Sequence, residues 1–206
     1  MVWEDGEGDL ASYPILMQFW AEGGPDAEGP SALWPRDTAV HSAKLDNGLT
    51  MWLVSEPGFP KVAFTAAVQG GFAADPADRP GISELLSKTV DQGTKARTAK
   101  QIAQELQAAG GDLSASSKKD FIEVSTAVLA SKMDAGIAVL SDILQNATFP
   151  DAEVTLAKRN LSDSLRQSES EPSFLARRAM AKVLFGDHPY HTDPGFRRGG
   201  YFRRSP

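Results

Sequence analysis

The sequence predicts an α+β domain in which helices pack on one face of a mainly antiparallel sheet. A tight-turn signal, Asp46-Asn47-Gly48, lies between two short apolar segments, which is typical of a β-hairpin. Alternating apolar residues over 61–69 and 120–130 indicate half-buried strands. Toward the C-terminus the apolar spacing becomes helical, so the predicted order is strands, two helices, two strands and then three helices.

Length, charge and composition limit the function classes. The 206 residues suffice for one well-cored domain, and a net charge of -6 argues against general affinity for nucleic acid or anionic membrane, because both need a basic surface. The chain has no cysteine, which excludes thiolate chemistry, disulfides and cysteine zinc sites. No apolar run approaches the roughly 20 residues that span a bilayer, and the first 30 residues do not resemble a secretory signal. We therefore expect a soluble protein without a membrane span.

The two ends of the chain differ in composition from its centre. Residues 1–36 are acidic and rich in Gly and Pro, which favours a linker or the remnant of an upstream region; their one apolar island, "YPILMQFW", could instead form a short strand or helical turn. Residues 195–206 hold four Arg and no aliphatic residue. This basic tail could bind phosphate or an acidic partner, or it could result from a shifted reading frame. The predicted domain is therefore 37–194.

The first predicted helix lies within the stretch "GISELLSKTVDQGT", residues 81–94. Its apolar residues fall at helical spacing and predict one buried stripe: Ile82, Leu85, Leu86 and Val90. Three polar residues then share the opposite side, because residues three and four apart stack on a helix: Glu84, Ser87 and Lys88. The segment before it, 70–81, contains several breakers and is expected to be a loop.

The remaining elements follow from caps and periodicity. A helix over 98–109 has Thr98 as its N-cap and ends at Gly110-Gly111. Strands 112–117 and 120–130 surround a "KKD" turn. A helix over 131–146 is expected to bury a stripe of four residues: Met133, Ile137, Leu140 and Leu144.

Two further helices complete the predicted domain. The longer begins after Phe149-Pro150 and has three apolar positions: Val154, Leu161 and Leu165. The last begins at Pro172 and ends at Gly186, with three apolar positions of its own: Leu175, Met180 and Val183.

Histidine and serine provide few candidates for catalysis. His188 and His191, with Asp187 or Asp193, are possible zinc ligands, but "GDHPYHTDP" is punctuated by Gly and Pro and is interpreted as a turn. His41 stands alone and is expected to face solvent before a strand. No serine lies in a Gly-x-Ser-x-Gly elbow, and the Gly-rich loop lacks the Lys-Ser/Thr ending of a phosphate loop.

Five segments in consistent order, from about Ala43 to Pro194, resemble one domain of the insulinase/pitrilysin family of zinc metallopeptidases. They are "KLDNGLTMWLV", "GGFAADPADRPGISELL", "DQGTKARTAKQIAQELQAAGGDLSAS", "FPDAEVTLAKRNLSDSLRQ" and "LFGDHPY". Five segments in family order are much more specific than any one of them. Active members of the family carry an inverted zinc motif, His-x-x-Glu-His.

The resemblance implies that the zinc motif has been replaced. Glu84 stands where the first His ligand would be, Ser87 at the catalytic Glu and Lys88 at the second His. The family's third ligand, a Glu on a later helix, corresponds to Ser164, with Asp163 as an off-register neighbour. We therefore expect no catalytic residue and no cofactor in this chain, and a salt bridge between Glu84 and Lys88 at i,i+4.

The resemblance also implies a function without catalysis. The expected role is to form a peptide-holding chamber with an active zinc peptidase subunit or domain, the strand at 61–69 lining the cavity and the loop at 70–81 shaping its rim. Two alternatives stay open: an active zinc endopeptidase with displaced ligands (Glu84, Asp163 and the His188/His191 loop), and a structural interaction protein without a peptidase partner. A fragment of a disrupted gene is a further possibility. The resemblance implies a periplasmic location if an upstream signal is missing, and otherwise a cytoplasmic one.

Overall fold

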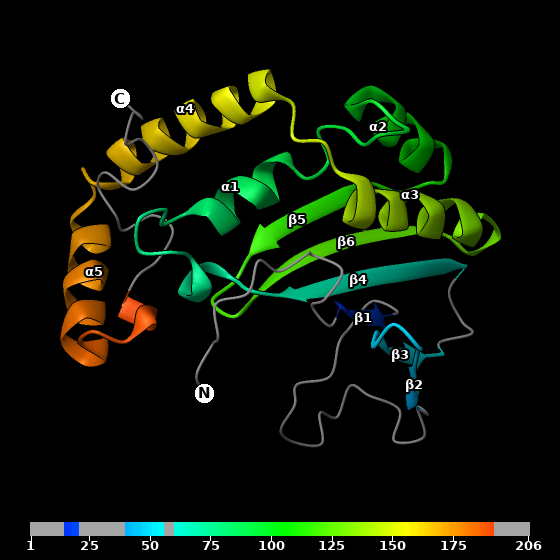
Figure 1. Cartoon of the computed structure of the whole chain (residues 1–206), viewed down its shortest axis with the longest axis horizontal. Coiled ribbons are helices and arrows are strands. Elements are labelled where there is room, and N and C mark those ends of the chain that lie inside the picture. Colours follow the sequence, from blue (N-terminus) through cyan, green and yellow to red (C-terminus); the bar gives the residue numbers. More distant parts are fainter. Residues whose placement is uncertain (1–14, 21–39, 56–59, 192–206) are drawn as a thin grey trace.

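The computed structural model describes residues 15–20, 40–55 and 60–191. These residues form one six-stranded sheet with helices α1 to α4 on one of its faces and α5 beyond its end (Figure 1). The mainly antiparallel α+β fold predicted from the sequence is confirmed, and so is the predicted order of the elements from the hairpin onward. Among the described helices, none combines the length and apolar character needed to cross a membrane.

The strands and helices have the following bounds. The strands are β1 Ile15–Trp20, β2 Val40–Lys44, β3 Thr50–Val54, β4 Lys61–Gln69, β5 Leu113–Ser117 and β6 Phe121–Leu129. The helices are α1 Ile82–Thr89, α2 Ala99–Ala108, α3 Met133–Asn146, α4 Asp151–Ser168 and α5 Pro172–Phe185. Three short 3-10 turns are η2 Phe72–Ala74, η3 Ala130–Lys132 and η4 Pro189–His191. The order across the sheet is β2-β3-β1-β4-β6-β5, and every neighbouring pair except β1 and β3 is antiparallel.

The hairpin predicted around Asp46-Asn47-Gly48 is confirmed. β2 and β3 pair antiparallel, and the amide of Leu45 donates to the carbonyl of Leu49 at 2.8 Å. Gly48 has φ +86°, a conformation that glycine adopts without steric cost. His41 is exposed, as expected, although it lies within β2 rather than before a strand.

The apolar island near the N-terminus is a strand. Residues 15–20 form β1, which pairs parallel with β3 and antiparallel with β4. The linker interpretation is therefore wrong for these six residues. Their backbone pairs with the edges of β3 and β4, whose N–H and C=O groups would otherwise lack a neighbouring strand. The rest of the segment 1–36, and the basic tail 195–206, lie outside the described residues.

The hydrophobic core lies between the sheet and the helices α2 and α3. The alternation predicted for β4 and β6 is confirmed by complete or nearly complete burial of Phe64, Ala66, Val124 and Val128. The stripe predicted for α3 is shifted, since Gly136, Val139, Leu140 and Ile143 are buried whereas Met133 is 41% exposed. The reason is the close approach at Gly136, where an added Cβ would lie 2.8 Å from a methyl group of Val128.

Candidate functional site

The candidate site is helix α1, which carries three of the residues that the sequence resemblance matches to a zinc motif, Glu84, Ser87 and Lys88. Its N-terminus is fixed by Asp75, whose carboxylate accepts hydrogen bonds from the amides of Gly81 at 2.5 Å and Ser83 at 3.1 Å. Burial of this carboxylate raises the pKa of Asp75 above its ordinary value, although the hydrogen bonds act in the opposite direction. The predicted loop 70–81 is thereby tied to the first turn of the helix.

The buried side of α1 differs in part from the one that the sequence predicts, although Val90 is buried as expected, at 4% exposed. Ser83 and Ser87 are 3% and 4% exposed, whereas Ile82 is 43% exposed. The hydroxyl of Ser117 on β5 donates to that of Ser83 at 3.0 Å, and the hydroxyl of Ser87 donates to the carbonyl of Glu84 at 2.8 Å. The expectation is therefore wrong for Ile82, which is exposed, and for Ser87, which is buried, whereas Leu86 and Val90 contact the core as expected.

The physical reason for this correction is that α1 packs against two neighbours. It contacts β5 on one side and α4 on another, and Figure 1 shows it between them. Small serine side chains allow the helix to approach β5 closely, while Leu85 and Leu86 are only half-buried. A two-sided environment of this kind cannot be deduced from the spacing of apolar residues within the helix.

The salt bridge expected between Glu84 and Lys88 is confirmed. Lys88 Nζ lies 3.3 Å from Glu84 Oε1, and the Glu84 side chain is 19% exposed against 48% for Lys88. The pair spans one turn of α1. The acidic residue precedes the basic one, which is the order that interacts favourably with the helix dipole. The carboxylate of Glu84 is therefore neutralised by an ammonium group from its own helix.

The other candidate residues are engaged elsewhere. Asp163 accepts a hydrogen bond from Arg166 at 2.9 Å on the exposed surface of α4, where Ser164 is also exposed. His188 and His191 lie at η4, and the His191 Nδ1 is 2.7 Å from the carbonyl of His188. Asp193 lies outside the described residues. Within the described part of the chain, no three His, Cys, Asp or Glu side chains come together as a metal site would require.

The side chains present do not fit a catalytic zinc ion at the aligned positions. Such a site needs three neutral or anionic ligands, an open water position and a carboxylate that accepts the proton of the water. Here one aligned position holds an ammonium, another holds a carboxylate already paired with it, and the position aligned with the proton acceptor is Ser87.

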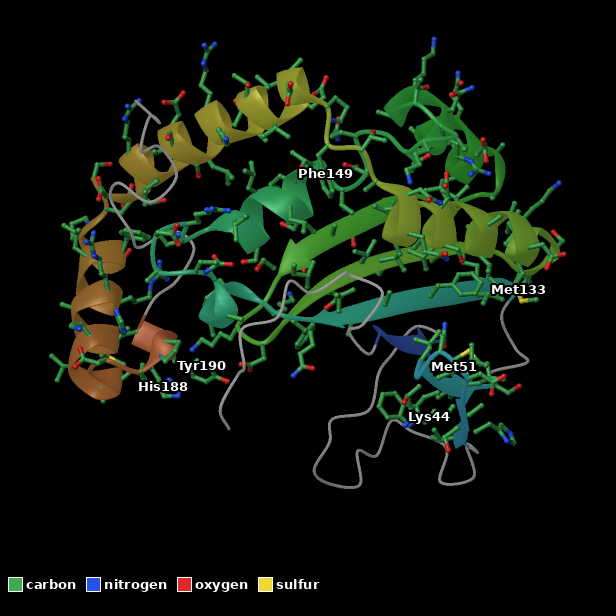
Figure 2. All side chains as sticks on the ribbon, viewed as in Figure 1. Lys44, Met51, Met133, Phe149, His188 and Tyr190 are labelled. Carbon is green, nitrogen blue, oxygen red and sulfur yellow. The ribbon has the colours of Figure 1, made fainter. Side chains whose placement is uncertain are left out.

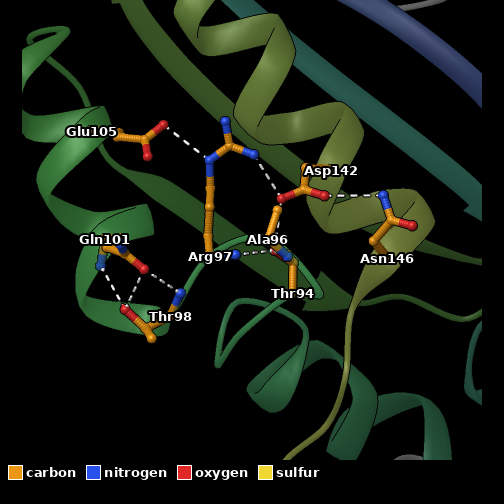
Figure 3. Close-up of polar contacts among 8 residues, drawn as sticks. All are labelled: Thr94, Ala96, Arg97, Thr98, Gln101, Glu105, Asp142 and Asn146. Atoms are coloured by element: carbon orange, nitrogen blue, oxygen red, sulfur yellow. Dashed lines mark hydrogen bonds and ion pairs between the residues drawn. The ribbon is translucent and has the colours of Figure 1, made fainter.

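A partly buried polar cluster that sequence reasoning missed fixes the segment after α1 (Figure 3). Asp142 on α3 accepts hydrogen bonds from Thr94 at 2.6 Å, Arg97 at 2.7 Å and Asn146 at 3.0 Å. The Thr94 hydroxyl in turn accepts from the amide of Arg97 at 2.9 Å. The hydrogen bond from Thr94, together with Arg97 and Asn146, holds the pKa of Asp142 below its ordinary value. Two contacts of this cluster are local in sequence, Asp142 with Asn146 at i,i+4 and Thr94 with Arg97 at i,i+3, but neither indicates that the two segments meet.

Comparison with known proteins identifies the family. Residues 50–192 match the family model described as Insulinase (Peptidase family M16). An "Uncharacterized zinc protease" from Rickettsia bellii is 28% identical over 147 residues, which make up 71% of this chain and 36% of the relative. The chain thus spans about a third of the length of that relative.

Two solved structures share the fold. A peptidase M16 inactive domain from Pseudomonas fluorescens superposes with a TM-score of 0.75 at 19% identity, over 81% of this chain and 40% of the other. Pitrilysin superposes with a TM-score of 0.67 at 19% identity, over 82% of this chain and 18% of the other. The family match covers more than half of the sequence and includes α1 and its surroundings. This chain therefore belongs to the insulinase family, peptidase family M16.

Proposed function

We propose that this chain is a metal-free insulinase-family domain that forms the wall of a peptide-holding chamber together with an active zinc peptidase subunit or domain. The zinc ion and the catalytic carboxylate belong to that partner. The observation that carries the proposal is the Glu84–Lys88 ion pair, which occupies two of the three aligned positions on α1.

Electrostatics support the absence of a metal at these positions. Two unit positive charges about 4 Å apart repel by roughly 4 kcal/mol at an effective dielectric of about 20. A zinc ion carries twice that charge, so its repulsion from Lys88 at a similar distance is about twice as large. The hydroxyl of Ser87 is buried and already donates to a backbone carbonyl, and a hydroxyl is a poor acceptor for a water proton.

The uncovered face of the sheet supports the chamber role. Helices α1 to α4 cover the face that holds Phe64 and Val124, so the opposite face of β4, β5 and β6 has no helix of this group over it (Figure 1). That opposite face carries small and polar side chains, among them Thr65, Ser114 and Ser125. The hydroxyls of Ser114 and Ser125 are 2.8 Å apart and exposed at the strand pair. A surface of this kind can accept hydrogen bonds from a peptide without selecting one side chain.

The proposal is tested by metal analysis and by activity in the same preparation. We expect the protein isolated from its own cells to co-purify with a second family subunit, with one zinc per assembly bound to that subunit. The isolated chain should bind less than a tenth of an equivalent of zinc and should not cleave a quenched fluorescent peptide. Stoichiometric zinc on this chain would instead support an enzyme with displaced ligands. An unchanged peptidase rate after removal of this domain from the assembly would also contradict the chamber role.

A restored variant provides a matched positive control. The quadruple substitution Glu84→His, Ser87→Glu, Lys88→His and Ser164→Glu supplies the family's ligand set on the same scaffold. We expect this variant to bind about one zinc, because nitrogen and carboxylate ligands replace the ammonium. A variant that folds and still binds no zinc would mean that α1 and α4 are not arranged as in active members.

A further inference from the structure

Phe149, between α3 and α4, holds a backbone conformation that a bulky residue rarely adopts. Its φ is +48°, and among the described residues other than glycine it alone has a positive φ. A large side chain in this left-handed region is strained, and the following residue, Pro150, restricts the backbone of Phe149 further. The ring of Phe149 is partly buried against the hydrophobic core. Burial of the ring therefore compensates for the strain of the backbone.

The chain that leads to this strained residue is fixed. The amide of Thr148 donates to the carbonyl of Gly93 at 3.0 Å, and the amide of Lys95 donates to the carbonyl of Asn146 at 3.1 Å. The carboxylate of Asp142 on α3 joins the same two segments. Helix α3 itself buries four residues. This part of the chain is therefore a rigid base.

The chain after Phe149 is held less firmly. Residues 151–191, which contain α4, α5 and η4, form a C-terminal arm, and its first helix, α4, lies beside α1 without a buried residue of its own. Within the described ranges, no hydrogen bond or ion pair connects α1 with α4, so packing alone joins the two helices. Separation of α4 from α1 would therefore leave no polar group without its partner.

The far end of the C-terminal arm is fastened by exposed contacts. The Tyr190 hydroxyl donates to the carboxylate of Asp120 at 2.6 Å, and the ammonium of Lys119 lies 4.8 Å from the ring centre of Tyr190. Phe174 is the one buried side chain of the arm among the described residues. Figure 2 shows Tyr190 at the opposite end of the arm from Phe149. The contacts of Tyr190 therefore act as a clasp, and the strained residue lies where the arm would turn.

We propose that the C-terminal arm is a hinged cover of α1, which turns about Phe149 and is released when the contacts of Tyr190 open. In the closed arrangement, which is the one described here, the backbone of Phe149 is strained and its ring is buried. In the open arrangement φ relaxes to a negative value and the ring leaves the core. Opening uncovers the side of α1 that faces α4. The hinge stands independently of the proposed chamber role.

The test measures the distance between two spin labels on the full chain, which is possible because the sequence has no cysteine. One label replaces Gln104, exposed on α2, and the other replaces Gln167, exposed near the end of α4. Gln167 lies about 24 Å along the helix from the start of α4, so a turn of about 30° would move it by about 12 Å. We expect double electron–electron resonance to show one main distance and a minor second one that differs by at least about 5 Å.

Three substitutions separate the clasp, the ring and the strain. Tyr190→Phe removes the hydroxyl of the clasp and should raise the population of the second distance at least about fivefold. In the Tyr190→Phe background, Phe149→Ala should raise it further, because alanine removes the ring and keeps the strain. Phe149→Gly also removes the ring, but glycine adopts a positive φ without strain. We therefore expect Phe149→Gly to leave at least about threefold less of the open arrangement than Phe149→Ala.

Two results would overturn the hinge. The first is a single distance in every variant. The second is opening by Phe149→Gly that equals or exceeds opening by Phe149→Ala, because burial of the ring alone would then account for the closed arrangement. A matched pair of labels at Gln104 and at Asp134, exposed on α3, should give one distance in all variants. A change in this control pair would mean that the whole domain loosens, which also contradicts a hinge at one residue.

Discussion

Substitution of Asp142 by Asn, which replaces one carboxylate oxygen with an amide group, should clearly destabilise the domain. The side chain of Asp142 is 10% exposed and accepts hydrogen bonds from Thr94, Arg97 and Asn146. Asn keeps the shape but loses the charge, and its amide group turns a donor toward one of these three donors. The change therefore both weakens the contacts and leaves a positive group without its main partner.

The magnitude follows from the number and type of contacts. A hydrogen bond to a charged group contributes about 1.5–3 kcal/mol, and removal of one partner of a buried ion pair costs about 3–5 kcal/mol. Arg97 keeps its second partner, Glu105, at 3.0 Å, which reduces the loss. We expect a decrease in the free energy of unfolding of about 3 kcal/mol at pH 7. With a urea m-value of about 2 kcal/mol/M, the midpoint shifts by about 1.5 M.

The effect should depend on pH with a defined sign. Because the pKa of Asp142 is lower in the folded state than its ordinary value of 3.8, the contribution of Asp142 is fully present well above pH 4. It is lost as the pH falls through the folded-state pKa. The difference between wild type and Asp142→Asn should therefore shrink between pH 7 and pH 3. The raised pKa of Asp75 acts in the opposite direction, but it cancels because both proteins carry Asp75.

Urea unfolding at several pH values, followed by tryptophan fluorescence and circular dichroism, measures this difference. The matched control is Asp163→Asn, which removes an exposed carboxylate that also pairs with an arginine, Arg166. We expect the control to change stability by less than about 0.5 kcal/mol, as is typical of surface ion pairs. A loss below 1 kcal/mol for Asp142→Asn, or a loss that does not vary with pH, would refute the account of the cluster.

Three further substitutions test the fold. Thr98→Ala removes the N-cap of α2 and one half of its capping box with Gln101, so thermal unfolding should show a loss of about 1 kcal/mol; no change would mean that the cap is not formed in solution. Leu140→Ala opens a cavity at a fully buried position and should cost about 2–5 kcal/mol in urea unfolding, and a smaller loss would place α3 away from the core. Gly111→Ala would drive a Cβ into the carbonyl oxygen of Ala127, so this variant should lose more than about 3 kcal/mol or fail to accumulate as folded protein, and normal stability would contradict this close approach.

The local elements could be predicted because their signals are local. Asp46-Asn47-Gly48 specifies a tight turn by backbone conformation, and Thr98 specifies a helix start because its side chain accepts a hydrogen bond from the amide of Gln101. Alternating apolar residues in β4 and β6 specify which face of the sheet is buried. The apolar island at β1 allowed a short strand but did not select it over a linker, because its partners β3 and β4 lie far along the chain, with Leu16 opposite Thr50 and Ile15 opposite Val68. A long-range pairing of this kind cannot be deduced from the apolar residues of the segment alone.

The candidate site was predictable in part. The Glu84–Lys88 ion pair depends only on i,i+4 spacing within one helix, so the sequence was sufficient. Burial of Ser87 depends on the contact of α1 with β5, and the cluster around Asp142 joins residues 45 and 48 positions apart. These features arise from tertiary packing, which helical periodicity does not encode.

The C-terminal pair of helices has consequences for how the domain opens. Helix α4 has no fully buried residue, and α5 has only Phe174, whereas α3 has four. Amide hydrogens of α4 and α5 should therefore exchange through a partial opening that leaves the sheet intact, at a lower free energy than those of β4 and β6. Any contact that covers α4 and α5 would suppress this opening. Proteolysis within α4 and α5 would then report how often these two helices open while the sheet stays folded.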